Sequence, residues 1–368
     1  MRIVLTWLST AYGGAEMLMP EIAEQLALLG AQVSVVWWRL GGPSYLGSAE
    51  RVQLHEATTA SGYRAALAAA IGNNAAGTVV ISNHRTVPVD LDQAQNVPVL
   101  AVAHAILQKG EPLRLVDPGS GELVGQAPEH WPWHLLERAA CWVGISAASA
   151  DSVRAVGPPG LPVTVIHNGV AVPERTPARA ERGQLLRVAA VGRPVAWKRL
   201  EDIVAAVAHP MLAGRIHLDV YGQSGSAPQR LAAELGLPAT FHGWIDDLPR
   251  RLARADVLAC AALMEGFGRC VIDAAGVSTP AIVPRAGAGP EVVLDGITGY
   301  CYDPADPDGL VLALRRAADA SPAQLAAVGR AARARALAWF TPGRCAAQYL
   351  QLAHETLAAP CQPARRVA

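Results

Sequence analysis

The sequence lacks the features that mark membrane-spanning and secreted proteins. Among its 368 residues, 51% are hydrophobic, yet no apolar run reaches the roughly 18 to 20 residues that a spanning helix needs. The opening stretch MRIVLTWLST has no charged region followed by a long apolar segment and a cleavage site, so we expect no signal peptide. We therefore predict a cytoplasmic protein without a transmembrane segment.

The sequence also lacks metal-binding or redox cysteine motifs and an excess of charge of one sign. The six cysteines form no Cys-x-x-Cys pair and no zinc-like cluster with histidine, so we interpret them as reduced, mostly buried thiols. The 31 basic and 31 acidic residues cancel, which argues against a nucleic-acid-binding protein. The balance is uneven, because residues 1–172 hold 9 basic and 13 acidic residues while the remainder holds 22 and 18. The second half is therefore better suited to bind an anion.

Strand-like and helix-like segments alternate in two series. The first series begins with RIVLTWLS, EMLMPEIAEQLALLG and QVSVVWW, and the second begins with LLRVAAVGR, EDIVAAVA and IHLDVYG. This alternation is typical of parallel sheets covered by helices, and the length fits two such domains. We predict an α/β protein with two Rossmann-like domains.

A polar segment rich in proline, arginine and glutamate, AVPERTPARAERGQ, separates the two series and has the composition of a linker. We predict a first domain over residues 1–172, a linker over 173–186, a second domain over 187–342 and a closing segment over 343–368. Because open α/β sheets bind ligands at the carboxyl ends of their strands, the loops that follow predicted strands are the places to search for a site.

Two such loops contain residues suited to a phosphate. STAYGGAE follows the first strand, where Gly13 and Gly14 would let the backbone approach a ligand near a helix N-terminus. VGRPVAWKR follows the first strand of the second series and contains Arg193 and Lys198, a forked and a compact cation. The alternatives are a tight turn for the first loop and a solvated basic patch for the second.

Two later loops contain acidic residues as well as glycines. In MEGFGRCVIDAAG, Glu265 would end a strand and Asp273 would lie on the following helix, where carboxylates suit sugar hydroxyls better than phosphates. The alternative makes Glu265 a cap and Asp273 an exposed helical acid. In PRAGAGPEVVLDGITGY, Glu291 lies early in a helix, where its charge also suits the helix dipole, so capping alone could explain it.

Taken together, these motifs resemble those of a known family. GGAE, HNGV, the spacing of Arg193 and Lys198, EGFG and GPEVVLDGITGY are similar to the retaining glycosyltransferases of the GT-B fold, family 4, or glycosyl transferases group 1. The resemblance implies two Rossmann-like domains facing across a deep cleft, with the acceptor bound by the first and the donor by the second. It also implies a C-terminal helix that returns to the first domain, and metal-independent transfer of a sugar from a nucleotide diphosphate to a hydroxyl acceptor with retention.

The resemblance also implies roles for particular residues. Arg193 and Lys198 would hold the donor diphosphate, Glu265 would bind hydroxyls of the donor sugar, and Asp273 would bind the ribose. His104, in VAVAHAI, would reach toward the reaction centre, although it could instead be a hydrogen-bonded core histidine.

The remaining predicted donor contacts come from loop backbones and one further acid. They are Gly13, Gly14, Gly266, Phe267, Gly268 and Glu291. His84, in ISNHR, is a weaker candidate for the role given to His104.

The sequence departs from the family pattern in three places. Asp273 replaces the usual glutamate and is one methylene shorter, Ala171 replaces the aspartate that commonly follows Asn-Gly-Val, and Pro20 interrupts a helix that is normally unbroken. Two rival functions stay open: a sugar-nucleotide epimerase of the same fold, and a nucleotide-sugar-binding module without catalysis.

The acceptor and any metal are less constrained. The segment Gln108–Trp131 is long enough to be a lid or an acceptor loop, or else a variable surface excursion. The acidic first half argues against strong docking on anionic membranes, so at most weak peripheral contact is expected, and a carbohydrate, lipid-linked or small-molecule acceptor remains open. The triplet Asp90-Leu91-Asp92 could suggest a metal, but we expect it to start a surface helix, and we expect no metal cofactor.

Overall fold

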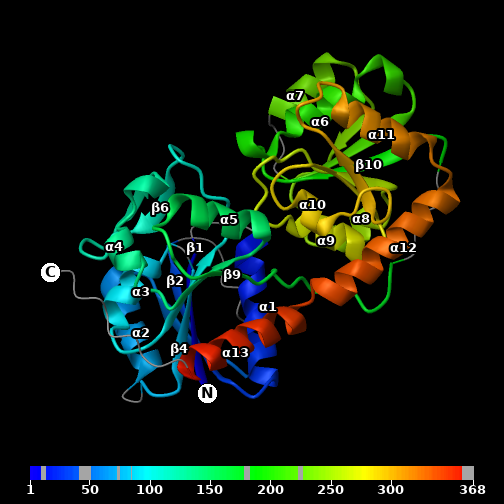
Figure 1. Ribbon diagram of the computed structural model, residues 1–368. Coiled ribbons are helices and arrows are strands. Elements are labelled where there is room, and N and C mark those ends of the chain that lie inside the picture. Colours follow the sequence, from blue (N-terminus) through cyan, green and yellow to red (C-terminus); the bar gives the residue numbers. More distant parts are fainter. Residues whose placement is uncertain are drawn as a thin grey trace. The chain divides into compact units, whose positions relative to one another are not determined.

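The computed structural model divides the chain into two compact units, Met1–Gly169 with Pro342–Ala368, and Val170–Thr341 (Figure 1). Each unit is built on one parallel sheet with helices, which confirms the predicted α/β class. The structure describes residues 1–9, 14–40, 51–72, 75–83, 85–177, 183–222 and 227–358, and for residues 14–17 only the backbone.

The first unit has a seven-stranded parallel sheet among its described residues, in the order β3-β2-β1-β4-β5-β8-β9. Its central strands are apolar and buried along their length, as a parallel sheet covered on both faces requires. The strands are β1 (Arg2–Ser9), β2 (Gln32–Arg39), β3 (Gln53–Ala57), β4 (Thr78–Asn83), β5 (Val99–Ala103), β8 (Cys141–Gly144) and β9 (Val163–Val165).

Helices from both ends of the sequence belong to this unit. They are α1 (Gly14–Leu28), α2 (Ala60–Ile71), α3 (Val87–Gln93), the 3-10 turn η1 (Pro128–His130), α4 (Trp133–Leu136), α5 (Ala147–Val156) and α13 (Pro342–Ala358). The C-terminal helix α13 packs along α1, and the two lie side by side in Figure 1. Pro20 lies inside α1, which nevertheless continues to Leu28.

The segment Gln108–Trp131 is folded against the first unit. It contains the antiparallel pair β6 (Leu113–Val116) and β7 (Leu123–Gln126). The amide of Val116 donates to the carbonyl of Arg85 at 2.8 Å, and Trp131 is buried in the core of the unit. This hairpin is therefore a packed element, which the sequence did not predict.

The Asp-x-Asp triplet lies on α3, but the expectation of a surface position is wrong for Asp90, whose side chain is completely buried. Its carboxylate accepts hydrogen bonds from Thr6 at 2.6 Å, from Tyr63 at 2.5 Å and from Ser82. A buried carboxylate persists only with such partners, so Asp90 anchors α3 to β1 and β4.

The second unit has a six-stranded parallel sheet in the order β12-β11-β10-β13-β14-β15 among its described residues. Its core lies between this sheet and helices such as α6 (Leu200–Val207) and α11 (Gly309–Asp319). The strands are β10 (Leu186–Val191), β11 (Ile216–Tyr221), β12 (Ala239–Phe241), β13 (Val257–Ala259), β14 (Ala281–Pro284) and β15 (Gly299–Tyr302).

Short helices and turns connect these strands, and one long helix closes the unit. They are η2 (Ala196–Lys198), α6 (Leu200–Val207), η3 (Pro210–Leu212), α7 (Ala227–Glu234), α8 (Leu248–Leu252), α9 (Arg269–Gly276), α10 (Gly289–Val292), α11 (Gly309–Asp319) and α12 (Pro322–Trp339). Helix α12 packs against α9.

All five cysteines in the described part of the chain are free, and four of them are buried, which confirms their interpretation as mostly buried thiols. Burial raises the pKa of Cys260 to about 11 and that of Cys345 to about 12, and it also raises the pKa values of Cys141, Cys270 and Cys301. Cys361 lies outside the described residues.

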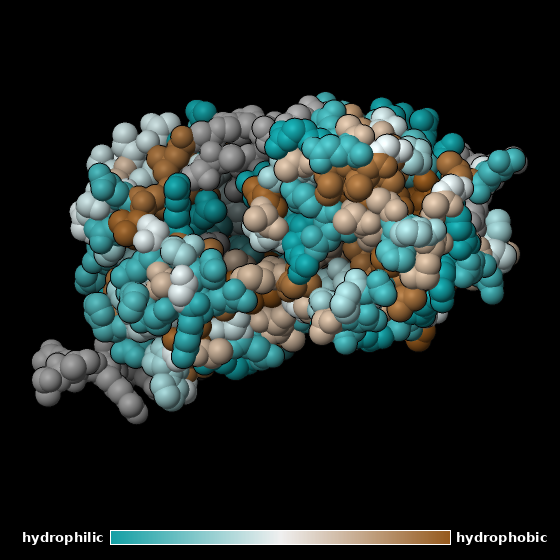
Figure 2. All heavy atoms as spheres, turned by 90° about the horizontal axis from the view of Figure 1, so that it is seen from above, coloured by the Kyte–Doolittle hydropathy of each residue, from teal (hydrophilic) through white to brown (hydrophobic). Residues whose placement is uncertain are grey.

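The helices of the described ranges include none that is both long and apolar enough to cross a membrane. Figure 2 shows hydrophilic residues spread over the visible face, with hydrophobic residues between them.

Candidate functional site

The predicted donor loops of the second unit gather at one edge of its sheet. Strands β10, β13 and β14 are parallel neighbours, so their carboxyl ends meet at the same edge. The loop after β10 contains Arg193 and Lys198, the loop after β13 contains Glu265, and the loop after β14 leads to Glu291.

Lys198 and Glu265 form the centre of this site. The Nζ atom of Lys198 donates a hydrogen bond to Oε2 of Glu265, and the two side chains are only 17% and 16% exposed. The stem of Lys198 crosses Gly192, where an added Cβ would lie 3.4 Å from the lysine Cδ. Burial, the largest single influence, would lower the pKa of Lys198, but the charge and hydrogen bond of Glu265, together with contributions from Cys270 and Cys260, raise that pKa overall, so the ammonium is charged at neutral pH.

A neighbouring aromatic side chain, which the sequence analysis did not single out, completes this arrangement. The Nζ atom of Lys198 lies 4.3 Å from the centroid of the Trp197 ring, at cation–π distance, and Trp197 is 42% exposed. The signal in the sequence was the tryptophan directly before the predicted cation. Arg193 follows the same strand and its side chain is exposed.

The loop of Glu265 is locked to the loop that follows β14. The amide of Ala288 donates to the carbonyl oxygen of Glu265 at 2.9 Å. Gly287 has a φ of 55°, and a Cβ there would lie 2.8 Å from the same oxygen, so only glycine permits this contact. The two loops therefore form one rigid surface.

The Gly-Phe-Gly turn presents its backbone and buries its ring. Phe267 is 4% exposed, and its ring packs edge-on against Phe340 with centroids 5.7 Å apart. Gly268 adopts the left-handed conformation and precedes the first residue of α9. The ring of Phe267 is therefore part of the packed interior, and the predicted contact of its amide with a donor stays a prediction.

Asp273 lies on α9 and is not the exposed helical acid of the alternative interpretation. Its side chain is 11% exposed, and its Oδ2 lies 3.6 Å from Nε of Arg269, one turn earlier. Burial raises the pKa of Cys270, and the carboxylates of Glu265 and Asp273 contribute to this shift. Both acids of the motif are thus close enough to act electrostatically on the thiol of Cys270.

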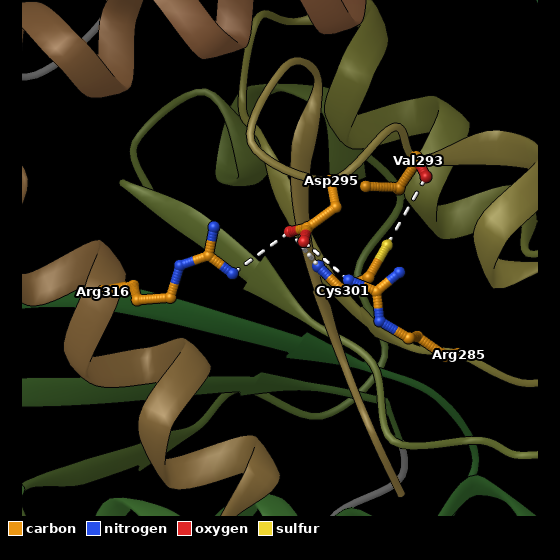
Figure 3. A network of polar contacts seen from close by, with 5 residues as sticks. All are labelled: Arg285, Val293, Asp295, Cys301 and Arg316. Atoms are coloured by element: carbon orange, nitrogen blue, oxygen red, sulfur yellow. Dashed lines mark hydrogen bonds and ion pairs between the residues drawn. The ribbon is translucent and has the colours of Figure 1, made fainter.

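A polar network holds the segment that follows α10 (Figure 3). Asp295 accepts from Arg285 at 2.7 Å, from Arg316 at 3.2 Å and from the amide of Cys301 at 2.9 Å. The thiol of Cys301 lies 3.5 Å from the carbonyl of Val293. The network joins the loop after β14, strand β15 and helix α11. It therefore holds the base of the predicted donor loop that contains Glu291.

Glu291 lies in the first turn of α10, as expected. Its carbonyl oxygen accepts from the guanidinium of Arg335 at 2.6 Å, and the carbonyl of Val292 accepts from the same guanidinium at 3.1 Å. This arginine of α12 therefore fastens the short helix that carries Glu291.

In the first unit, His104 follows β5 directly, as predicted. Its ring meets that of Trp7 edge-on at 5.1 Å. Burial, with a contribution from the charge of Arg85, lowers the pKa of His104 to about 4, so its imidazole is neutral at physiological pH. Gly14 is the first residue of α1, whereas Gly13 and His84 lie outside the described residues.

Residues 186–320 match the family described as Glycosyl transferases group 1. The second unit carries a group 1 glycosyltransferase domain. This domain contains every donor-binding residue that was predicted in the second half, and the resemblance to glycosyl transferases group 1 is confirmed.

The group 1 domain and the rest of the chain have known relatives. The chain is 30% identical to an MMP alpha-(1->4)-mannosyltransferase of Mycolicibacterium hassiacum over 224 residues, which are 58% of this chain and 54% of that protein. The chain therefore spans about half the length of this curated relative.

Solved structures extend the likeness across nearly the whole chain. Sucrose-phosphate synthase of Thermosynechococcus elongatus has a TM-score of 0.79 at 20% identity, covering 98% of this chain and 100% of that one. The Anabaena protein HepE in complex with UDP and glucose has a TM-score of 0.71 at 18% identity, covering 96% and 100%. These similarities confirm the predicted GT-B fold.

Proposed function

We propose that the protein is a retaining glycosyltransferase of family 4, which moves a sugar from a nucleotide-diphosphate sugar to a hydroxyl acceptor without a metal. The observation that carries this proposal is the pairing of Lys198 with Glu265 at the strand ends of the group 1 domain. A cation suited to phosphate and an acid suited to hydroxyls lie side by side there, as a ligand that joins a diphosphate to a sugar requires.

In the proposed reaction, the bond between the anomeric carbon and the diphosphate oxygen breaks, and that oxygen keeps the electron pair. Lys198 and Arg193 stabilise the negative charge that develops there, and this contact strengthens most in the transition state. The acceptor oxygen attacks the same face of the sugar, and its proton passes to the departing phosphate.

Each acid has a binding role in this scheme. Glu265 accepts hydrogen bonds from sugar hydroxyls, Asp273 binds the ribose, and the backbone of Gly266, Phe267 and Gly268 supports sugar and phosphates. Asp273 is shorter than glutamate, so a bridging water or a closer helix compensates. In the first unit, the imidazole of His104 is neutral and is able to accept or donate a hydrogen bond, as the catalytic role proposed for it requires.

The relatives suggest the class of donor. HepE has been solved with UDP and glucose, and the Mycolicibacterium relative is named a mannosyltransferase. We therefore propose a hexose linked to a nucleoside diphosphate, used by a cytoplasmic enzyme that acts on a carbohydrate, lipid-linked or small-molecule acceptor.

A thermal-shift panel of UDP-, GDP-, ADP- and TDP-sugars tests donor binding directly, because a ligand that binds the native state raises the unfolding temperature. We expect one nucleotide to stabilise the protein and Glu265→Gln to reduce the shift. Absence of any shift with all four sets would contradict the proposal.

Incubation with the selected donor separates the rival functions. A new sugar nucleotide formed without acceptor would indicate an epimerase, whereas binding without turnover across an acceptor screen would indicate a binding module. For a transferase, the anomeric configuration of the product by NMR decides retention, and an inverted product would contradict the proposed mechanism.

A further inference from the structure

Lys198 and Glu265 form an ion pair with each other in the structure, although in the proposed function they bind different parts of the donor. The ammonium of Lys198 has Glu265 as its anionic partner, and both side chains are largely buried. A donor diphosphate must replace that carboxylate at Lys198, and Glu265 is then released for the sugar hydroxyls. A further contact is needed to keep the Lys198 ammonium in position while its anionic partner changes.

Trp197 supplies a contact of the required kind. Its ring lies 4.3 Å from the ammonium, and it carries no charge, so it does not compete with a phosphate. The stem of Lys198 also lies over Gly192, which offers no side chain of its own to hold it. The indole is therefore a neutral support for the ammonium whichever anion is bound.

We propose, resting on the proposed function, that Trp197 is a positioning residue: its indole holds the Lys198 ammonium while the donor diphosphate replaces Glu265 as the anionic partner. The residue acts through Lys198 and not by touching the reacting atoms. An aromatic ring at this position should therefore matter more than the size of the side chain.

The test is a double-mutant cycle in the full-length chain, assayed with the sugar nucleotide that the donor panel selects. We expect Trp197→Leu to lower kcat by about threefold to thirtyfold, the range of a cation–π contact, with a smaller change in KM for the donor. Trp197→Phe should retain most of the activity. In a Lys198→Ala background, Trp197→Leu should lower kcat no further, since coupled residues are not additive.

Trp339→Leu is the matched control, because this tryptophan belongs to the same unit, is 49% exposed and ends α12. Urea unfolding of every variant shows which ones are folded. If Trp197→Leu does not fold, the activity of Trp197→Phe still tests whether an aromatic ring is sufficient. Equal loss in Trp197→Phe and Trp197→Leu, or full additivity with Lys198→Ala, would overturn the inference while the proposed function stands. Absence of turnover in the unmodified protein would instead contradict the proposed function itself.

Discussion

Lys198 is the residue whose charge the proposed chemistry needs most. Replacing it with alanine should lower kcat by about 10²–10³-fold, the cost of losing one preorganised donor to a developing charge. The dissociation constant of the nucleoside diphosphate, measured by calorimetry, should rise much less. Arg250→Ala is a suitable control because that side chain is 78% exposed on α8. Comparable losses in binding and turnover would contradict the transition-state role.

Arg199 has an unusual backbone for a residue with a side chain. Its φ of 50° and ψ of 43° lie in the left-handed region, directly after Lys198. We expect Arg199→Gly to be more stable than Arg199→Ala by about 1 kcal/mol, because both remove the ion pair with Asp202 but only glycine adopts this conformation without cost. Urea unfolding of the two variants gives the difference, and equal stabilities would show that the site is not strained.

The sequence predicted the positions of the candidate residues in the fold better than it predicted their contacts. Arg193, Lys198 and Glu265 were found because loops at strand ends follow from the order of strands and helices. The pairing of Lys198 with Glu265 joins residues 67 positions apart and depends on the register of β10 against β13, which local patterns do not contain. The burial of the Phe267 ring against Phe340 was hidden for the same reason.

At the scale of elements, α12 passes the turn that follows α9 at a position that has room only for glycine. A Cβ at Gly329 would lie 1.9 Å from the carbonyl oxygen of Ser278. Gly329→Ala should therefore destabilise the protein by about 1–3 kcal/mol, the cost of overpacking, although alanine is normally the better helix former. Urea unfolding measures the change.

The exposed residue Ala327 of the same helix provides the matched control. Ala327→Gly should cost about 1 kcal/mol through helix propensity alone. A stabilised Gly329→Ala variant would show that α12 and the turn at Ser278 separate easily.

The Asp295 network makes a pH-dependent contribution to stability. Burial alone would raise the pKa of Asp295, but the hydrogen bond from the Cys301 amide and the charges of Arg316 and Arg285 lower it below its usual value. The carboxylate therefore stabilises the fold above its ordinary pKa of about 4, and this contribution is lost as the pH falls through the lower folded-state pKa.

We expect Asp295→Asn to destabilise the protein at pH 7 and to differ less and less from the unmodified protein below about pH 4. Denaturant unfolding over a pH series measures the two curves. Curves that stay parallel into acid would contradict the role of the charge.

Strands with a clear apolar pattern were predicted from the sequence, and elements without such a pattern were missed. The buried strands β1, β2 and β4 are mostly apolar and rich in β-branched residues, which identified them. Strand β3 reads QLHEA and is largely exposed at the edge of its sheet, so no apolar pattern marked it. The β6–β7 hairpin was missed because its position depends on long-range contacts, such as the hydrogen bond from the Val116 amide to the Arg85 carbonyl.

For the whole molecule, we predict that turnover does not depend on a divalent metal. In the proposed reaction, Arg193 and Lys198 would supply the positive charge that a metal would otherwise provide at the leaving group. Asp90 of the Asp-x-Asp triplet is engaged with three hydroxyls inside the core. Activity should be unchanged after treatment with EDTA. Loss of activity in chelator, with rescue by manganese, would overturn this expectation.

Because the buried cysteines have raised pKa values, their rate of alkylation reports how often the surrounding structure opens. A thiol that remains protonated and shielded does not react with an alkylating reagent until the surrounding structure opens. Cys345 lies in the first unit and Cys260 in the second, beside the Lys198–Glu265 pair. Mass spectrometry of timed alkylation would therefore follow the opening of each unit separately, without introducing a cysteine.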